Sequence, residues 1–450
     1  MLVIYQQNLL SDIRRNNMAV IHTDMIPTGK IKALHGVGQP PFQGVNFSML
    51  QYLKAFSCPF SRLHDVQGVY GGGRWVDIPN LFRDFDADPE DPASYDFTFT
   101  DLLMKALVEN GVEPFFRLGV TIENQCTIKS YRIDPPKDPL QWAKICEGVI
   151  RHYNEGWADG YHMNIRYWEI WNEPDNSHIQ RENMMWNGTM EQYLELYGTA
   201  SRYLKERFPD IRIGGFASCG FYGILGDRND PKQARNVYYL DFADAFLEYV
   251  KNHNLPLDFF SWHSYGSIEE TVKFAAYARE RLDAYGFDDV EHSLNEWNCQ
   301  PKARGTLKHA ALTAGMMLAL QNTSLDTAMF YDARFGTSIY GGMFNPLTAK
   351  PFPAYYGFVA FEELYKRKIQ TDLGFDIPGV YGIAAGTKED GCIVLSNTGT
   401  EPVPLECELP AGVKIMGCRI ITEGKIWEEI PSADVLPGES VLCMWLGSEK

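Results

Sequence analysis

The stretch Trp168-Glu169-Ile170-Trp171-Asn172-Glu173-Pro174-Asp175 joins an apolar run to a proline and decides the fold prediction. Side chains alternate between the two faces of a strand, and Pro174 cannot donate a ladder hydrogen bond, so we expect a strand to end here. Residues at the carboxyl end of a barrel strand face the open mouth of the barrel, where Asn172 and Glu173 would lie. The flanking Trp171 and proline partly desolvate the Glu173 carboxyl group, which raises its pKa toward the range that a general acid uses.

A second stretch, Ser293-Leu294-Asn295-Glu296-Trp297-Asn298, repeats this pattern, with a glutamate that follows an apolar run and abuts a tryptophan. It closes the seventh of eight predicted strands, and the first stretch closes the fourth. Strands four and seven lie on roughly opposite sides of an eight-stranded barrel. The two glutamates can therefore approach within about 5–5.5 Å, the separation used by retaining glycosidases.

Short apolar runs alternate with amphipathic helical stretches through most of the chain, which is typical of βα units around a parallel sheet. The predicted fold class is α/β, a (β/α)₈ TIM barrel with a smaller antiparallel β-sandwich. The predicted barrel strands are Ile31–Gly36, Phe60–Leu63, Glu113–Leu118, Arg166–Ile170, Arg212–Gly215, Leu257–Ser261, Glu291–Asn295 and Thr327–Tyr331.

The pattern changes from about Gly374 onward. Short β-branched and apolar segments are separated there by turn residues such as Pro410-Ala411-Gly412, which predicts the sandwich. We expect three parts: residues 1–27 as an N-terminal segment that adds strands to the sandwich, residues 28–365 as the catalytic barrel, and residues 366–450 as the β-sandwich.

Composition narrows the class of partner. The formal net charge is −17. Nucleic acids and anionic membranes are bound by basic patches, so we expect neither as a partner and favour a neutral or cationic substrate. Aromatic residues make up 13% of the chain. That share suits a sugar-binding cleft, and it suits large buried cores equally well.

The nine cysteines are scattered singly and form no C-x-x-C pair, which argues against a zinc site and suggests reduced thiols. The first twenty residues lack the basic region and apolar core of a secretory signal. No stretch reaches the roughly 18 apolar residues that a membrane-spanning helix needs. We therefore expect a cytoplasmic location and no metal or organic cofactor. Cys299 is interpreted as a passive neighbour of Glu296.

The two glutamate stretches resemble clan A of the glycoside hydrolases, and most closely family 39, which contains β-xylosidases and α-L-iduronidases. In that clan an Asn-Glu pair ends strand four and a glutamate ends strand seven. The likeness runs from roughly Gly36 to Tyr356. It departs at Asn295, where the family usually carries threonine. The residues that carry the likeness are Trp168–Pro174, Leu294–Asn298, Ser261-Trp262-His263-Ser264-Tyr265 and Arg62-Leu63-His64-Asp65.

The resemblance implies a role for each matching residue. Glu173 would be the acid/base and Glu296 the nucleophile. Asn172 would bond the 2-hydroxyl of the sugar, a contact that strengthens in an oxocarbenium-like transition state. The other implied roles are His263 and Tyr265 lining the cleaved sugar, Tyr265 orienting Glu296, Arg62 lowering the pKa of Glu296 and His64 touching the substrate.

Structural alternatives stay open at this point. Arg62 could form a buried ion pair, for example with Asp65, and His64, His263 and Tyr265 could be core residues. Asp332 could read polar groups of the substrate or pair with Arg334.

Trp297, Trp262 and Trp171 could be sugar platforms or packing residues. Glu291 and Asp332 are alternative nucleophiles.

The expected activity is hydrolysis of a small carbohydrate with net retention, by exo-action on short oligosaccharides or glycosides, as in a β-xylosidase. Two other functions use the same features. A transglycosidase would pass the glycosyl group to a sugar acceptor with the same carboxylates, and a decayed barrel would bind carbohydrate without catalysis. Assembly into homo-oligomers is left open by the sequence.

Overall fold

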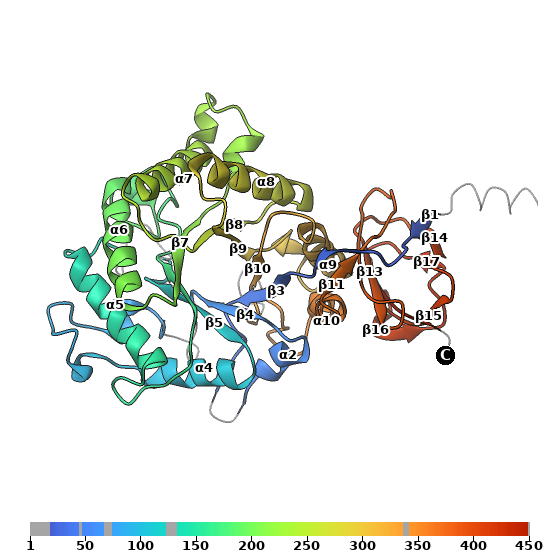
Figure 1. Ribbon diagram of the computed structural model, residues 1–450, viewed down its shortest axis with the longest axis horizontal. Coiled ribbons are helices and arrows are strands. Elements are labelled where there is room, and N and C mark those ends of the chain that lie inside the picture. The colour runs from blue at the N-terminus through green and yellow to red at the C-terminus, as the bar shows by residue number, and fades with distance from the viewer. Residues whose placement is uncertain (1–18, 45–46, 67–73, 123–132, 336–341, 449–450) are drawn as a thin grey trace, which may run out of the picture. The chain divides into compact units, whose positions relative to one another are not determined.

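The computed structural model describes residues 19–44, 47–66, 74–122, 133–335 and 342–448, and it contains a closed barrel of eight parallel strands (Figure 1). The predicted (β/α)₈ fold is confirmed. Around the barrel the strands follow the order β10-β3-β4-β5-β6-β7-β8-β9. Their bounds are β3 Ala33–Gly38, β4 Phe60–Leu63, β5 Glu113–Leu118, β6 Tyr167–Ile170, β7 Arg212–Ser218, β8 Phe259–Ser264, β9 Glu291–Trp297 and β10 Thr327–Tyr331.

Helices follow the strands and surround the barrel in Figure 1. Several begin at a side chain that satisfies free backbone N–H groups. Thr189 and Gln192 form a capping box at one helix, Ser267 and Glu270 form another, and Asp138 caps a third. The helices between residues 50 and 285 are α2 Leu50–Ala55, α3 Ile78–Leu81, α4 Thr98–Glu109, α5 Pro139–Asn154, α6 Met190–Arg207, α7 Ala234–Asn252 and α8 Ile268–Tyr285, with 3₁₀ turns η1 Pro92–Ser94, η2 Gln180–Glu182, η3 Tyr222–Leu225 and η4 Pro231–Gln233.

Aromatic side chains fill the amino-terminal end of the barrel. Phe115 stacks on Tyr167 with ring centroids 4.9 Å apart and meets the edge of Phe259 at 5.0 Å. The Tyr167 hydroxyl donates to Glu291, which also pairs with Arg212. Because this end is packed solid, a substrate can reach the barrel residues only from the carboxyl end of the strands.

Contacts divide the chain into two compact units, one formed by the described residues of Leu34–Asn298 and Thr323–Phe335 and one by the described residues of Met1–Ala33, Cys299–Asn322 and Gly336–Lys450. The second unit contains a seven-stranded sheet in the order β16-β15-β18-β13-β12-β11-β2 and a three-stranded sheet in the order β1-β14-β17. The strand bounds are β1 Ala19–His22, β2 Pro27–Lys30, β11 Ile369–Thr371, β12 Val380–Gly386, β13 Gly391–Asn397, β14 Val403–Glu408, β15 Val413–Thr422, β16 Lys425–Ile430, β17 Val435–Leu436 and β18 Ser440–Ser448.

The seven-stranded sheet is antiparallel, as predicted for the carboxyl-terminal part. Strand β1 pairs with β14 and β2 pairs with β11, so described residues of the N-terminal segment belong to these sheets; residues 1–18 lie outside the described part. Helices α9 Leu307–Leu320 and α10 Pro353–Tyr365, with η5 Pro301–Ala303, group with this unit. The assignment of residues 28–365 to a barrel domain and of residues 366–450 to a sandwich domain stays a prediction.

Within the described ranges, no helix combines the length and the hydropathy that crossing a membrane requires.

Candidate active site

Arg62, on β4, forms the centre of the polar cluster at the carboxyl end of the barrel. Its side chain is 1% exposed. Nε donates to Glu169 at 2.7 Å, Nη1 to Glu296 at 3.2 Å and Nη2 to Asn172 at 2.5 Å. Burial lowers the pKa of Arg62, but the charges of Glu169 and Glu296 outweigh it and leave the pKa above its ordinary value. Arg62 thus forms a buried ion pair, which was the structural alternative, but its partners are Glu169 and Glu296 and not Asp65.

Glu169, on β6, is a buried residue of the site that sequence reasoning missed. It accepts hydrogen bonds from Ser261 and Asn295 in addition to Arg62, and its carboxylate is 0% exposed. A usable signal was present, because a charged residue inside an apolar strand must find a buried partner. Glu169 thereby ties the arginine of β4 to residues of β8 and β9.

Glu173 follows β6 in a left-handed turn with φ of 45°. Its backbone N–H donates to Ala217 at 3.0 Å, which fixes the turn against β7. The His263 imidazole lies 2.7 Å from Oε1, and the Asn176 amide donates to Oε2 at 2.9 Å. The carboxylate is thus held on both oxygens.

Glu296, on β9, faces Glu173 across the barrel mouth. Tyr265 donates to its Oε1 at 2.8 Å, and Arg62 donates to its Oε2 at 3.2 Å. His263 Nδ1 lies 3.8 Å from the same Oε2. One oxygen of Glu173, one of Glu296 and a His263 nitrogen all lie within 4.8 Å of one another. Two carboxylates at that spacing can reach the same carbon atom from different sides.

Burial and charge set the pKa values of this cluster. Burial raises the pKa of Glu173, but the hydrogen bond and charge of His263 outweigh it, so the pKa lies below its ordinary value. Burial also raises the pKa of Glu296, and His263 and Arg62 offset only part of that rise. Burial lowers the pKa of His263, but Glu296 and Glu173 raise it above its ordinary value.

The sequence analysis predicts a raised pKa for Glu173 and a lowered one for Glu296, and the free site has the opposite order. The physical reason is His263, whose imidazole hydrogen-bonds to Glu173 and not to Glu296. These two directions favour a protonated His263 beside an ionised Glu173 in the free site. Arg62 does lower the pKa of Glu296, as predicted, but burial has the larger effect.

His64 and Asp332 lie at the same end of the barrel as the two glutamates. His64 is buried with its Nε2 3.2 Å from Asp65, and burial together with Arg117 and Arg62 holds its pKa well below the ordinary value. Asp332 is bonded to Arg334, whose backbone N–H, Nε and Nη2 all donate to it. The pairing alternative for Asp332 and Arg334 is therefore the one observed.

The structure does not bring Trp297 to the barrel mouth. Its ring is 0% exposed and meets the ring of Phe330 edge to face at 5.3 Å. The register between β8 and β9 shifts at Asn295, so Asn295 and Glu296 both bond residues inside the barrel, and Trp297 packs on Phe330 instead. Trp262 and Trp171 are also buried, with indole N–H groups bonded to His292 and to the Met185 carbonyl.

Glu291, the alternative nucleophile, lies at the first residue of β9, at the opposite end from Glu296. Burial raises the pKa of Cys299 to about 12, which agrees with a passive thiol.

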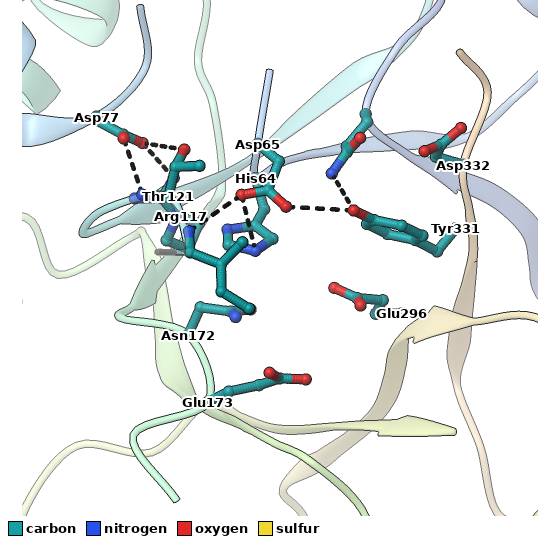
Figure 2. Close-up of polar contacts among 12 residues, drawn as sticks. His64, Asp65, Asp77, Arg117, Thr121, Asn172, Glu173, Glu296, Tyr331 and Asp332 are labelled. Atoms are coloured by element: carbon teal, nitrogen blue, oxygen red, sulfur yellow. Dashed lines mark hydrogen bonds and ion pairs between the residues drawn. The ribbon is translucent and has the colours of Figure 1, made fainter. Parts of the chain in front are cut away.

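A second group that sequence reasoning missed forms the wall on the side of β3, β4 and β10 (Figure 2). Gln39 donates to the Tyr331 hydroxyl at 2.8 Å, and that hydroxyl donates to Asp65 at 3.2 Å. Arg334 donates to the Asp65 backbone carbonyl at 3.2 Å. Figure 2 shows Asp65 and Tyr331 bordering the same space as Glu296, with Glu173 on its far side.

Among the residues that the structure describes, two clusters of side chains have the types and spacing that a metal ion needs. One is Glu173, His263 and Glu296, and the other is the more exposed set His22, Asp24 and Asp372 in the sandwich unit. In the first cluster the imidazole lies at hydrogen-bond distance from Glu173, and Glu296 is already bound by Arg62 and Tyr265. Both oxygens of Glu173 and both oxygens of Glu296 therefore already accept hydrogen bonds from protein side chains, while Nε2 of His263 has no hydrogen-bond partner among the described residues.

The model of glycosyl hydrolases family 39 matches residues 63–297, which is more than half of the chain. A β-xylosidase from Caldicellulosiruptor saccharolyticus is 23% identical over 357 residues, covering 70% of this chain and 66% of that protein. The α-L-iduronidase of Homo sapiens is 27% identical over 245 residues, covering 52% of this chain and 35% of that protein. The chain thus spans less than two thirds of the length of either relative.

Among solved structures, a glucosidase from Croceicoccus marinus aligns over 96% of this chain and 100% of its own, with a TM-score of 0.76 and 21% identity. That likeness supports the barrel and sandwich architecture. The matched range, residues 63–297, includes Glu173, His263 and Glu296 of the cluster described above. The chain belongs to glycosyl hydrolases family 39.

Proposed function

We propose that the chain is a retaining glycoside hydrolase that acts at the ends of short oligosaccharides or on simple glycosides, in the manner of a β-xylosidase. The observation that carries the proposal is the approach of Glu173 and Glu296, whose nearest oxygens lie within 4.8 Å. Inverting enzymes hold their carboxyl groups about 6.5–9.5 Å apart to admit a water molecule between them and the sugar. The spacing in this chain favours direct attack by one carboxylate.

In the proposed first step a Glu296 oxygen forms a bond to the anomeric carbon as the bond to the leaving oxygen breaks. Glu173 donates its proton to that leaving oxygen. In the second step Glu173 takes a proton from water, the water oxygen bonds to the anomeric carbon and Glu296 leaves. Two inversions at one carbon give net retention.

The surroundings of Glu296 support its assignment as the nucleophile. Arg62 and Tyr265 bond its two oxygens and hold the carboxylate in one orientation. Positive charge and hydrogen bonds to a carboxylate favour its ionised form, which is the nucleophilic one. Asn172, fixed by Arg62, is the residue proposed to bond the 2-hydroxyl of the sugar.

The Glu173–His263 contact supports the acid/base assignment. In the free site His263 holds the proton that Glu173 must deliver, across a contact of 2.7 Å. A bound sugar excludes water and neutralises Glu296 during attack, which removes part of the charge that holds the proton on the imidazole. The proton then passes to Glu173 and from there to the leaving oxygen.

The test is a panel of p-nitrophenyl glycosides of pentoses, hexoses and uronates in both anomeric series, followed by proton NMR of the first sugar released. We expect turnover of a β-configured pentoside and a product with the anomeric configuration of the substrate. Product of the opposite configuration would reject the two-step route, and a wild-type protein inactive on the whole panel would reject the hydrolase.

The expected partner is a small carbohydrate. A cytoplasmic location and assembly into homo-oligomers remain predictions from the sequence. Adding a sugar acceptor to the assay and analysing the products separates hydrolysis from transfer to a sugar.

A further inference from the structure

Asp65 differs from the other buried carboxylates around the barrel mouth. Glu169, Asp77 and Asp332 each bond an arginine side chain, with distances of 2.7, 2.6 and 2.8 Å. Within the described ranges, no lysine or arginine side chain pairs with the Asp65 carboxylate, and its only cationic contact, His64, is kept neutral by its lowered pKa. Burial raises the pKa of Asp65, and the charges of Arg334 and Arg117 offset part of that rise without bonding the carboxylate, so its oxygens stay available to accept hydrogen bonds.

The hydrogen bonds to Asp65 leave part of its capacity unused. The Tyr331 hydroxyl donates to Oδ2 at 3.2 Å, and the Ile122 backbone N–H reaches Oδ1 at 3.4 Å, which is long for such a bond. A carboxylate can accept about four hydrogen bonds. Its side chain is 13% exposed, whereas that of Asp77 is 4% exposed, so a ligand can reach Asp65.

The position of Asp65 fits the part of a sugar farthest from the anomeric carbon. Glu173 and Glu296 fix where C1 must lie, and Asn172 lies beside them. Figure 2 shows Asp65 across the space from Glu173, with Tyr331 beside it. A pyranose ring with C1 at the two glutamates therefore presents its C3 and C4 groups to Asp65.

We propose that Asp65, oriented by Tyr331, determines specificity by accepting hydrogen bonds from the C3 and C4 hydroxyl groups of the bound sugar, and that it selects neutral sugars over uronates. The inference rests on the proposed function. A buried carboxylate accepts hydrogen bonds from hydroxyl groups and repels a carboxylate of the ligand.

The nearby arginines do not cancel this preference. Arg334 is bonded to Asp332, and its Nη1 donates to the Asp65 backbone carbonyl and not to the carboxylate. Arg117 is 0% exposed behind the wall and pairs with Asp77. Arg334 is 17% exposed, but its hydrogen bonds are directed at Asp332 and at the Asp65 backbone, so a substrate carboxylate would have to compete with Asp332 for it.

The experiment compares wild type and Asp65→Asn on p-nitrophenyl β-D-xyloside and on its 3-deoxy and 4-deoxy analogues. We expect kcat/KM for the parent xyloside to fall roughly 10–100-fold, the range for a hydrogen bond to a charged group. With each deoxy analogue the loss of kcat/KM caused by Asp65→Asn should be smaller than with the parent xyloside, because one of the two hydroxyl groups that Asp65 binds is absent. Tyr331→Phe should give the same pattern with a smaller loss of about 2–10-fold.

A second arm uses p-nitrophenyl β-D-glucuronide. Asp65→Asn should narrow the ratio of xyloside to glucuronide activity, because the repelling charge has been removed. Asp77→Asn is the matched control, since it removes a buried carboxylate of the same network that no ligand can reach. It should change all substrates by the same factor and leave their ratios unchanged.

The outcomes separate the two proposals. If Asp65→Asn loses the same factor on the parent and on both deoxy analogues, Asp65 is structural and the inference is overturned while the hydrolase stands. A wild-type protein that prefers the glucuronide also overturns the inference. If the wild type hydrolyses no glycoside of the panel, the proposed function fails and the inference fails with it.

Discussion

The Arg62 guanidinium and the Glu169 carboxylate form a fully buried ion pair, with Nε 2.7 Å from Oε2. The same guanidinium reaches Glu296 and Asn172, so this one pair underlies the arrangement of the barrel mouth. A buried pair of this kind adds little net stability over an apolar pair of the same shape, but breaking it leaves an uncompensated charge.

Replacement of Glu169 by glutamine should therefore destabilise the protein by about 3–5 kcal/mol. Urea unfolding followed by circular dichroism measures the change. The control is Glu109→Gln, which removes the exposed pair that Lys105 and Glu109 make at 3.8 Å. That change should be below about 1 kcal/mol, the range for surface pairs. Equal losses in the two variants would contradict the central role of Arg62 and Glu169.

Alanine substitutions at the two glutamates should have different consequences. Glu296→Ala should be nearly inactive, and azide should restore turnover to a glycosyl azide of inverted configuration, because azide enters where the nucleophile is missing. Glu173→Ala should lose roughly 10²–10⁴-fold, and less with good leaving groups, because only the proton transfer is lost. Azide should rescue it with retained configuration. Product NMR checks both, and wild-type rates in either variant would reject its assignment.

Activity should follow a bell-shaped pH profile. The acid limb should lie above pH 4.5, because the pKa of Glu296 is raised from that value mainly by burial. The alkaline limb should lie above pH 6.5, because Glu296 and Glu173 raise the pKa of His263 from that value. His263→Gln should move the alkaline limb of kcat/KM to lower pH, since Glu173 alone then holds the proton. An unmoved limb would show that His263 does not share it.

Asp175 should make stability fall as the pH rises. Burial, together with the charge of Glu173, raises the pKa of Asp175 from 3.8 to about 7, so the folded state binds a proton that the unfolded state has released. Folding stability should decrease between about pH 4 and pH 7, by about 1.4 kcal/mol for each pH unit that separates the folded and unfolded pKa values.

The variant Asp175→Asn removes this titration. Its stability, measured by urea unfolding at pH 4, 5.5, 7 and 8, should lose less on going from pH 4 to pH 8 than that of the wild type. His263 also makes folding stability fall as the pH rises. Its raised pKa stabilises the fold below pH 6.5, and this stabilisation is lost as the imidazole deprotonates at higher pH. A slope unchanged by Asp175→Asn would show that Asp175 is ionised throughout.

Chelation should leave turnover unchanged. Glu173, His263 and Glu296 have metal-ligand spacing, but His263 already lies at hydrogen-bond distance from Glu173, and Arg62 and Tyr265 already bond Glu296. Dialysis against EDTA should therefore preserve kcat/KM within about twofold, since no step of the proposed mechanism uses an ion. Activity that is lost on dialysis and returns with zinc or calcium would mean that the cluster binds a metal.

The barrel and its two glutamates follow from local sequence. Each glutamate sits at the end of an apolar strand, so its depth in the barrel is set by the strand and can be read from a short segment. The position of Trp297 could not be derived from strand alternation, because Asn295 is an extra residue in the register between β8 and β9 and interrupts the alternation just before Glu296. Its possible contact with sugar was suggested only by its place next to Glu296 in the chain.

Asp65, Tyr331 and Gln39 could not be assembled in this way. They come from three strand ends far apart in the chain, and their contacts depend on irregular backbone beyond the strands. Asp65 itself has φ of 55°, which strand periodicity does not anticipate. The pKa order of the two glutamates was missed for a related reason, since it depends on which of them His263 bonds.

The contacts of Arg62 also bear on how such barrels can be recombined. One side chain from β4 holds a carboxylate of β6 and a carboxylate of β9, so these three segments share a single set of distances. A chimera that takes its first four barrel strands, β3 to β6, from one family member and its last four from another would keep Arg62 with Glu169 and take Glu296 from the other parent. Exchanging β4, β6 and β9 as a group, and leaving the other strands to vary, is the route by which active hybrids should be obtained.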